Sequence, residues 1–452
     1  MKRSRVILLT ALPLLLSSCV GNSDVPDGAK TLSIAFAEAG FGRTFLQTWQ
    51  DLYNEAYPEE KIYLDLEGDS QMTTSYLPRL QSGRNLPDIF MVLSTNWQAD
   101  ALKGYLEPID DVYASEVFDK PGTKIHDYIQ DNFQEFGKVG DHYYAMPWSV
   151  GPGGLVYNVS MFQQYNWKVP ETFEELVALC DQIKSDTAGT VAPFAWSGQT
   201  AAYWDFFTKN IWAQFEGEEG WKTFWDFGSP EVFKQTGRLK ALEAFETLIC
   251  DAGSPKNSIE GASAKTFMQA QMSFINSEAA MIPNGCWIEN EIKTSLPAGF
   301  RMAMMKTPKM AGSTHENLSC NTSGDFMVVP AKAAHKDLAK KFLAFISSEQ
   351  CALSFSKDAG GLRPFKYEPS KIEGITEFSK GVFEIYENST NLFDVSNNPM
   401  YYQNFVNVWP SYGTPYSRMI QDEETPQEVI DTIYNYVSSH WSTFQKQAGI
   451  TD

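Results

Sequence analysis

Hydrophobic and polar positions in the first hundred residues switch between two periods. Residues 32–36 alternate as in a strand, and residues 45–56 then carry apolar side chains at helical spacing. Residues 62–66 alternate again, and residues 89–93 form a short apolar run typical of a buried strand. Strands interleaved with helices predict a mostly parallel sheet covered on both faces, with ligands bound beyond the carboxyl ends of its strands.

A second α/β section begins near residue 150, and its helices carry clear start signals. Thr172 with Glu175, and Thr425 with Glu428, have the spacing of a capping box before an apolar helical stripe. Residues 203–250 are rich in aromatic residues and are predicted to be mainly helical. No repeat of 20–50 residues is present in the sequence, so a solenoid or propeller is not supported.

The first residues have the pattern of a secretory signal. Three positive charges in the first five residues precede an apolar stretch over residues 6–16, which is shorter than the roughly 20 residues of a spanning helix. Leu16-Ser17-Ser18-Cys19 resembles the bacterial lipobox, in which the cysteine thiol is lipidated after cleavage. We therefore expect residues 1–18 to be a lipoprotein signal peptide, Cys19 to be the lipid anchor, and residues 19–30 to form a tether.

Charge excludes whole classes of partner. The 452-residue chain has 36 Lys and Arg against 56 Asp and Glu, a net charge of −20. Removal of residues 1–18 also removes three positive charges, which leaves 33 − 56 = −23. A surface this negative repels phosphate, so we expect no nucleic-acid partner and no membrane contact beyond the lipid anchor.

Sequence motifs of known enzymes are absent. The five histidines include no H-E-x-x-H pair, no serine lies in G-x-S-x-G, and Gly40-Phe41-Gly42 is followed by Phe45 where a dinucleotide fingerprint needs glycine. The five cysteines after Cys19 include no C-x-x-C pair. We expect no metal, no cofactor and no catalysis, although a glycosidase pair of Asp or Glu is not visible in a sequence.

Aromatic residues make up 14% of the chain, which is more than a core needs, and several lie beside amides, carboxylates or glycines in segments predicted to be loops. An aromatic face accepts the C–H face of a sugar ring, and neighbouring amides and carboxylates can bind its hydroxyls. This combination predicts a carbohydrate site. The segments are Asn96-Trp97, Pro147-Trp148-Ser149, Trp196-Ser197-Gly198, Tyr203-Trp204-Asp205, Asn284-Gly285-Cys286-Trp287, and Asn404-Phe405 near Trp409.

An ordered set of segments closely resembles the extracellular solute-binding proteins, family 1, of carbohydrate ABC importers. The resemblance covers nearly all of the chain after the signal. The matching segments are residues 87–90 (Pro-Asp-Ile-Phe), 104–110 (Gly-Tyr-Leu-Glu-Pro-Ile-Asp), 144–148 (Tyr-Ala-Met-Pro-Trp), 156–158, 170–176, 279–285 before Trp287, and 336–343.

The resemblance implies a two-lobed periplasmic-binding-protein-like fold of type II. Each lobe would be a mostly parallel sheet flanked by helices, and the chain would cross the hinge near residues 147–150, 301–306 and 357–363. One lobe is then residues 31–148 with 306–358, and the other is 149–305 with 359–452. A ligand that touches both lobes would favour the closed state, which a membrane permease in another chain would recognise.

The resemblance also implies the residues of the sugar site. Simpler explanations exist for some of them: Glu38 could be surface charge, Trp148 could pack at the hinge, and Arg363 could pair with an acid to lock the lobes. The implied residues are Glu38, Phe41, Asn96, Trp97, Trp148, Trp196, Tyr203, Trp204, Asn284, Trp287, Asp325, Arg363, Asn404 and Trp409.

Residues 281–291 look most like the branch of the family that binds N-acetylglucosamine or its dimer, although Cys286 departs from the small polar residue expected there. The main hypothesis is a monomeric sugar-binding lipoprotein on the outer face of the cytoplasmic membrane, or in the periplasm of a Gram-negative cell. The alternatives are a secreted glycoside hydrolase or lyase that uses an Asp/Glu pair, and a surface adhesin with a lectin-like site.

Overall fold

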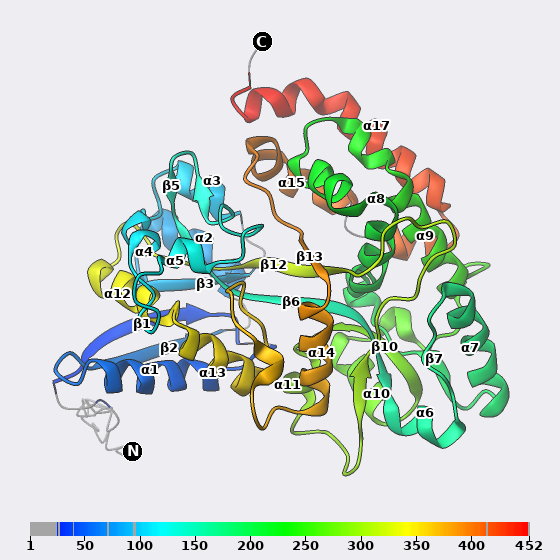
Figure 1. The fold of residues 1–452 in the computed structure, drawn as a ribbon. Helices are drawn as coiled ribbons and strands as arrows, with labels where there is room; N and C mark the ends of the chain where they lie inside the picture. Colours follow the sequence, from blue (N-terminus) through cyan, green and yellow to red (C-terminus); the bar gives the residue numbers. More distant parts are fainter. Residues whose placement is uncertain are drawn as a thin grey trace, which may run out of the picture.

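The computed structural model describes residues 25, 28–38, 40–69, 72–93, 96–412 and 415–450. Within these ranges it describes no side chain for residues 72, 73, 323, 324, 405–407 and 409–412. Cys19, the predicted signal peptide and most of the tether therefore lie outside the described residues, as does the side chain of Trp409. The predicted α/β fold with two lobes is confirmed: Figure 1 shows two bodies of strands and helices joined by two long strands, β6 and β12.

Most of the described strands are short, and among them only β6 and β12 exceed seven residues. The strands in the described part of the chain are β1 (Lys30–Phe36), β2 (Ile62–Gly68), β3 (Ile89–Leu93), β4 (Lys138–Val139), β5 (His142–Tyr143), β6 (Ala145–Asn158), β7 (Ala192–Phe194), β8 (Cys250–Asp251), β9 (Ser254–Pro255), β10 (Ala279–Gly285), β11 (Met302–Met304), β12 (Leu318–Val328) and β13 (Thr390–Phe393).

Nine of the described strands form one sheet in the order β2-β1-β3-β12-β6-β10-β7, with β11 paired to β6 and β13 paired to β12, while β4 with β5 and β8 with β9 form two separate two-stranded sheets. Pairing is parallel at both ends of the path, between β2, β1 and β3 and between β10 and β7. Pairing is antiparallel around β6, whose residues 145–152 bind β12 and whose residues 153–158 bind β10 and β11. One strand thus passes from the sheet of the first lobe to that of the second.

Helices cover the strands on both sides, as in Figure 1. The α-helices among the described residues are α1 (Thr44–Ala56), α2 (Met72–Ser82), α3 (Trp97–Leu102), α4 (Asp110–Ala114), α5 (Ile125–Tyr128), α6 (Val159–Tyr165), α7 (Phe173–Asp186), α8 (Asp205–Asp226), α9 (Thr236–Ile249), α10 (Phe267–Ile275), α11 (Ile288–Ile292), α12 (Lys336–Ile346), α13 (Glu349–Ala359), α14 (Glu377–Glu387), α15 (Pro399–Tyr412), α16 (Pro415–Ile420) and α17 (Pro426–Gln447). The 3-10 helices are η1 (Gly198–Trp204), η2 (Pro230–Lys234), η3 (Ala262–Ala264) and η4 (Pro369–Lys371).

The predicted helix starts are confirmed at atomic detail. The side chains of Thr172 and Thr425 each accept a hydrogen bond from the backbone three residues on, and Glu175 and Glu428 bind back to the cap. Each box satisfies two amides that would otherwise lack a partner at a helix start. No helix in the described part of the chain combines the length and the hydropathy that a membrane span requires.

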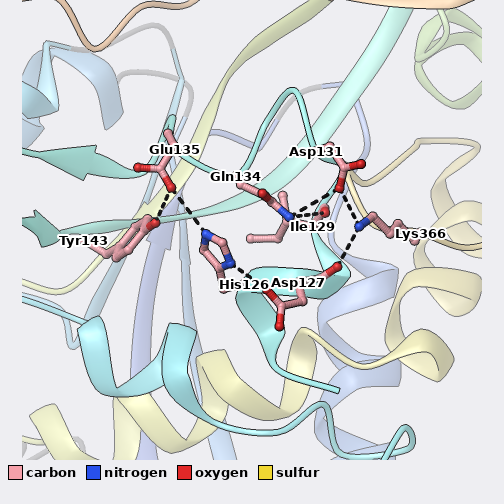
Figure 2. Close-up of polar contacts among 8 residues, drawn as sticks. All are labelled: His126, Asp127, Ile129, Asp131, Gln134, Glu135, Tyr143 and Lys366. Atoms are coloured by element: carbon pink, nitrogen blue, oxygen red, sulfur yellow. Dashed lines mark hydrogen bonds and ion pairs between the residues drawn. The ribbon is translucent and has the colours of Figure 1, made fainter. Parts of the chain in front are cut away.

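The segment that follows α13 is tied to the first lobe by polar contacts, which Figure 2 shows in close-up. Lys366 Nζ donates to Asp131 Oδ1 at 2.6 Å and to the carbonyl of Asp127 at 2.8 Å. Nearby, His126 lies between Asp127 and Glu135, and the hydrogen bond to Asp127 raises the pKa of His126. Because these groups are partly exposed, their contacts add little to the free energy of unfolding. Their main effect is to hold the segment after α13 in position.

Candidate functional site

A run of aromatic rings crosses from the second lobe to the first, and we call it the aromatic chain. Its members are Tyr203, Phe206, Trp287, Phe41 and Trp148. Successive ring centroids lie 5.1, 5.2, 6.3 and 5.8 Å apart. The rings come from η1, α8, the β10–α11 connection, the β1–α1 connection and β6. Spacings of this size are those of ring pairs in direct contact.

Exposure differs along the aromatic chain. Phe41 and Trp148 are buried, at 8% and 5% exposed, and Trp148 also stacks on Phe45 with an interplanar angle of 9°. Tyr203, Phe206 and Trp287 are only partly buried. Tyr203, Phe206 and Trp287, at the second-lobe end of the aromatic chain, therefore offer ring surface to a ligand. Phe41 and Trp148, at the other end, are part of the core.

Glycines in β6 and β10 let these side chains approach the backbone. A Cβ at Gly285 would lie 2.2 Å from the Trp287 ring, and a Cβ at Gly153 would lie 2.7 Å from the Phe206 ring. A Cβ at Gly151 would lie 2.4 Å from Cys286 Sγ. Heavy atoms do not pack at such distances, so the rings occupy their places because these positions are glycine.

Polar groups gather beside the rings at the crossing of β6 and β12. Ser149 Oγ donates to Asp325 Oδ2 at 2.5 Å. Asp325 interrupts the regular register of β12 with β6, which is a bulge-like irregularity, and bulges often re-aim side chains. Burial raises the pKa of Asp325 to about 7, against the opposing effect of the Ser149 hydrogen bond.

A second polar group lies on the adjacent face of α8. Lys209 Nζ bridges Asp394 Oδ2 at 3.0 Å and Asp205 Oδ2 at 3.7 Å. The hydroxyl of Tyr416 donates to Asp205 Oδ1 at 2.5 Å and also pairs with Thr208 Oγ1 at 2.7 Å. Burial raises the pKa of Asp205. Because the negative charge of Asp394 also acts on Asp325, the two polar groups share one electrostatic environment.

Two buried donors near the aromatic chain have no hydrogen-bond partner among the described residues. They are Trp148 Nε1 and Asn284 Nδ2, and the Asn284 side chain is 1% exposed. The side-chain oxygen of Asn284, Oδ1, accepts a hydrogen bond from the Gly285 N–H at 2.8 Å. A buried donor without a partner costs roughly 1–3 kcal/mol, so such donors are expected where a polar ligand binds.

Several predicted site residues lie at this place and others at its margin. Phe41, Trp148, Tyr203, Asn284, Trp287 and Asp325 are brought together as described above. Glu38 pairs with Arg43 on the exposed connection after β1, and that hydrogen bond lowers the pKa of Glu38. Asn96 is half-buried at the start of α3, where its side chain makes no capping hydrogen bond.

Three predicted rings lie in the hydrophobic core instead. Trp97 is 2% exposed and packs on Phe326, with the ring centroids 5.3 Å apart. Trp196 is 2% exposed, and its Nε1 donates to Ser258 Oγ at 2.8 Å. Trp204 is fully buried among the rings of Phe194 in β7, Phe207 in α8 and Phe245 in α9. Rings enclosed on this scale present no face to a ligand in this conformation.

Arg363 and Asn404 have structural partners. Arg363 is fully buried and donates to the carbonyls of Trp148 at 3.1 Å, Pro147 at 3.5 Å and Ile346, so it joins backbone segments and does not pair with an acid in these contacts. Burial lowers its pKa to about 10. Asn404 Nδ2 donates to the carbonyls of Met400 and Phe444, which fixes α15 to α17.

Some residues at the site were missed by the sequence analysis. Phe206 was overlooked in favour of its neighbour Trp204, although Tyr203 and Phe206 are three positions apart and so share one helical face. Lys209 and Asp394 carried no local signal, because only the packing of α8 beside β12 and β13 brings them together.

The arrangement offers stacking surface, hydrogen-bond donors and carboxylate acceptors. Lys209 neutralises part of the charge of Asp205 and Asp394. No group of three or more His, Cys, Asp or Glu among the described residues could hold a metal ion. Two surface hollows of about 320 and 220 Å³ lie elsewhere, beside α14 and beside α4 and α12, and neither is lined by the aromatic chain.

Comparison with known sequences gives the family of the chain. Residues 51–373 match the family described as bacterial extracellular solute-binding protein. The multiple sugar-binding protein of Streptococcus mutans is 23% identical over 326 residues, which is 70% of each chain. The diacetylchitobiose binding protein NgcE of Streptomyces coelicolor is 25% identical over 257 residues, 56% of this chain and 52% of that protein.

Solved structures support the same fold. A chitin oligosaccharide binding protein matches with a TM-score of 0.64 and 18% identity, over 90% of this chain and 98% of the other. RafE from Streptococcus pneumoniae matches with a TM-score of 0.66 and 16% identity, over 92% of this chain and 98% of the other. Together with the match over most of its length, the two-lobed structure shows that the chain belongs to the bacterial extracellular solute-binding protein family.

Proposed function

We propose that this protein captures a sugar or oligosaccharide between its two lobes and delivers it to the permease of an ABC importer. The observation that carries the proposal is the aromatic chain, which is partly exposed at Tyr203, Phe206 and Trp287 and lies beside buried donors that lack a partner among the described residues. Stacking on a sugar ring and hydrogen bonding to its hydroxyls need both features in one place. The relatives named for sugars, chitin oligosaccharides and diacetylchitobiose support the same substrate class.

The proposed site consists of residues from both lobes. Trp287, Phe206 and Tyr203 stack on the sugar. The hydroxyl groups of the sugar are bound by Asn284, Asp325 and Ser149. The polar side of the site is formed by Lys209 with Asp205 and Asp394. Glu38 and Asn96 reach the ligand from the first lobe on closure. The N-acetylglucosamine or chitobiose class remains the more specific proposal, and the donor of Asn284 suits the carbonyl of an N-acetyl group.

Lobe closure is the proposed mechanism. The proposed lobes are residues 31–148 with 306–358 and residues 149–305 with 359–452. Residues 306–317 precede the β12 crossing and contact the second lobe, since the Phe173 N–H donates to the Lys309 carbonyl and Gln214 Nε2 donates to the Pro308 carbonyl, both at 3.0 Å. A ligand held by both lobes binds the closed state more tightly and shifts the population toward it. The protein acts as a monomer without catalysis or cofactor. Removal of residues 1–18 and lipidation of Cys19 place it at the outer face of the cytoplasmic membrane or in the periplasm.

Calorimetry on the purified protein tests the proposal. The panel contains N-acetylglucosamine, chitin oligosaccharides, raffinose and a neutral non-sugar polyol as control, and small-angle scattering follows compaction. We expect at least one sugar to bind with a decrease in the radius of gyration. Release of shorter sugars on incubation would point to the glycosidase alternative, and tight binding without compaction would point to the adhesin. Mass spectrometry of the membrane-bound protein tests Cys19.

A further inference from the structure

The turn at residues 40–42, which follows β1 of the first lobe, is held by α11 of the second lobe. Asn290 Nδ2 donates to the Gly40 carbonyl at 2.5 Å. The backbone of Gly40 also hydrogen-bonds the carboxylate of Glu291, the next residue of α11. Helix α11 of the second lobe thus binds the backbone of Gly40, a residue of the first lobe, through two neighbouring side chains.

Glu291 is itself held in place. Gln271 Nε2 of α10 donates to Glu291 Oε2 at 2.5 Å. Burial raises the pKa of Glu291, and the hydrogen bonds from Gln271 and Gly40 act in the opposite direction. A partly buried carboxylate with fixed donors on two sides has little freedom, so it can orient the turn without a large loss of side-chain entropy.

The turn fits α11 closely because it lacks side chains at two positions. Gly40 and Gly42 have φ values of +57° and +65°, a region that favours glycine. A Cβ at Gly40 would lie 3.4 Å from Trp287, and a Cβ at Gly42 would lie 3.4 Å from Asn290 Nδ2. Between these glycines, Phe41 is directed toward Trp287 and Trp148, with centroids 6.3 and 5.8 Å away.

We propose that Asn290 and Glu291 are positioning residues that latch the 40–42 turn onto α11 and so set Phe41 against Trp287. The inference rests on the proposed function in taking Trp287 as the ring that stacks on a sugar. Because the latch contacts join residues of the two lobes directly, they stabilise the arrangement in which the lobes meet. Removing them lowers the fraction of protein that is competent to bind, and the apparent affinity falls in proportion.

The test compares Asn290→Ala and Glu291→Gln with the matched control Glu289→Gln. Glu289 lies on the same helix and is also partly buried, but it accepts hydrogen bonds from Thr376 Oγ1 at 2.6 Å and Ser379 Oγ at 3.1 Å, away from the turn. In the ligand-free protein, we expect amide exchange of the peptide that contains residues 40–42 to be about tenfold faster in both latch variants. We also expect a larger radius of gyration, and no change in the control.

The outcomes separate this inference from the proposed function. The latch would be overturned, even if sugars bind, by wild-type amide exchange at residues 40–42 and a wild-type radius of gyration in both latch variants. Equal changes in Glu289→Gln would also overturn it, because they would indicate a general loosening of α11. If the latch variants open as expected while no sugar of the panel binds the wild type, the latch stands and the proposed function fails. With a bound sugar identified, we expect its affinity to fall three- to tenfold in both variants, in line with a smaller competent fraction.

Discussion

Ser149 Oγ donates to Asp325 Oδ2 at 2.5 Å, and this bond joins the two long strands where β6 and β12 cross between the lobes. Burial raises the pKa of Asp325 to about 7, and the negative charge of Asp394 acts in the same direction. An acid with this pKa changes its charge close to neutral pH. Stability of the crossing therefore depends on pH through one identifiable group.

The first prediction concerns Asp325→Asn. An aspartate in the unfolded chain has a pKa near 3.9, so between about pH 4 and 7 the folded protein holds a proton that the unfolded chain has lost. The wild-type free energy of unfolding therefore falls as pH rises through this window. Relative to wild type, Asp325→Asn should gain about 3 kcal/mol between pH 4.5 and 7.5, as measured by urea denaturation. Asp65→Asn, at an exposed position of β2, is the control for the loss of one carboxylate.

The second prediction concerns Trp287→Ala. Trp287 is partly exposed and contacts both Phe206 and Phe41, so its loss removes the middle of the aromatic chain. We expect the affinity for a bound sugar to weaken by about 2 kcal/mol or more in calorimetry, with the fold retained by circular dichroism. Phe118→Ala removes a ring that is 43% exposed and packs on Phe345 and Tyr57 in the first lobe. Equal loss of affinity in both variants would remove Trp287 from the site.

Local signals account for what the sequence predicted well. The capping boxes at Thr172 and Thr425 each depend on hydrogen bonds between residues three positions apart, and both helices begin where these signals place them. Strand and helix periods are equally local, so the order of β1, α1, β2 and β3 followed from the pattern of apolar residues alone.

Long-range packing decided the rest. Trp204 and Phe206 are two positions apart, and only the packing of η1 and α8 against β10 turns one ring into the core and the other toward Trp287. Arg363 was predicted at the ligand from the family resemblance, yet its partners are carbonyls more than 200 residues earlier in the chain and one on α12. Such contacts have no signature in residue spacing.

The third prediction follows from the partners of Arg363. The guanidinium donates to carbonyls of β6 and α12 and lies over the rings of Trp49 and Phe365, with its Cζ atom 5.0 and 4.6 Å from their centroids. Arg363→Met leaves those buried carbonyls without donors, so we expect a loss of at least about 3 kcal/mol in the free energy of unfolding. Arg363→Lys should also destabilise, since an ammonium group cannot reproduce the planar fork.

Urea denaturation measures both Arg363 variants, and Arg84→Met, at an exposed position after α2, is the control for loss of one charge. A contrary result would be an Arg363→Met variant that unfolds at the wild-type urea concentration but has lost sugar binding. That pattern would mean that the guanidinium contacts the ligand and adds little to the fold.

The last prediction uses two neighbouring glycines of β6 as a matched pair. A Cβ at Gly153 would lie 2.7 Å from the Phe206 side chain, whereas a Cβ at Gly154 would lie 3.6 Å from its nearest neighbour, an atom of Met304. Neither position has the positive φ that favours glycine. Gly153→Ala must therefore displace Phe206, and with it the contact to Trp287 at 5.2 Å, while Gly154→Ala fits without a shift.

We expect Gly153→Ala to reduce sugar affinity about tenfold or more, and Gly154→Ala to stay within about twofold of wild type, when both are measured by calorimetry with the same ligand. Thermal unfolding gives the second readout, because overpacking at Gly153 should cost about 1–3 kcal/mol of stability. Wild-type affinity in a folded Gly153→Ala protein would show that Phe206 can move without consequence for binding. The ring would then be part of the wall behind Trp287, and the stacking surface would be limited to Trp287 and Tyr203.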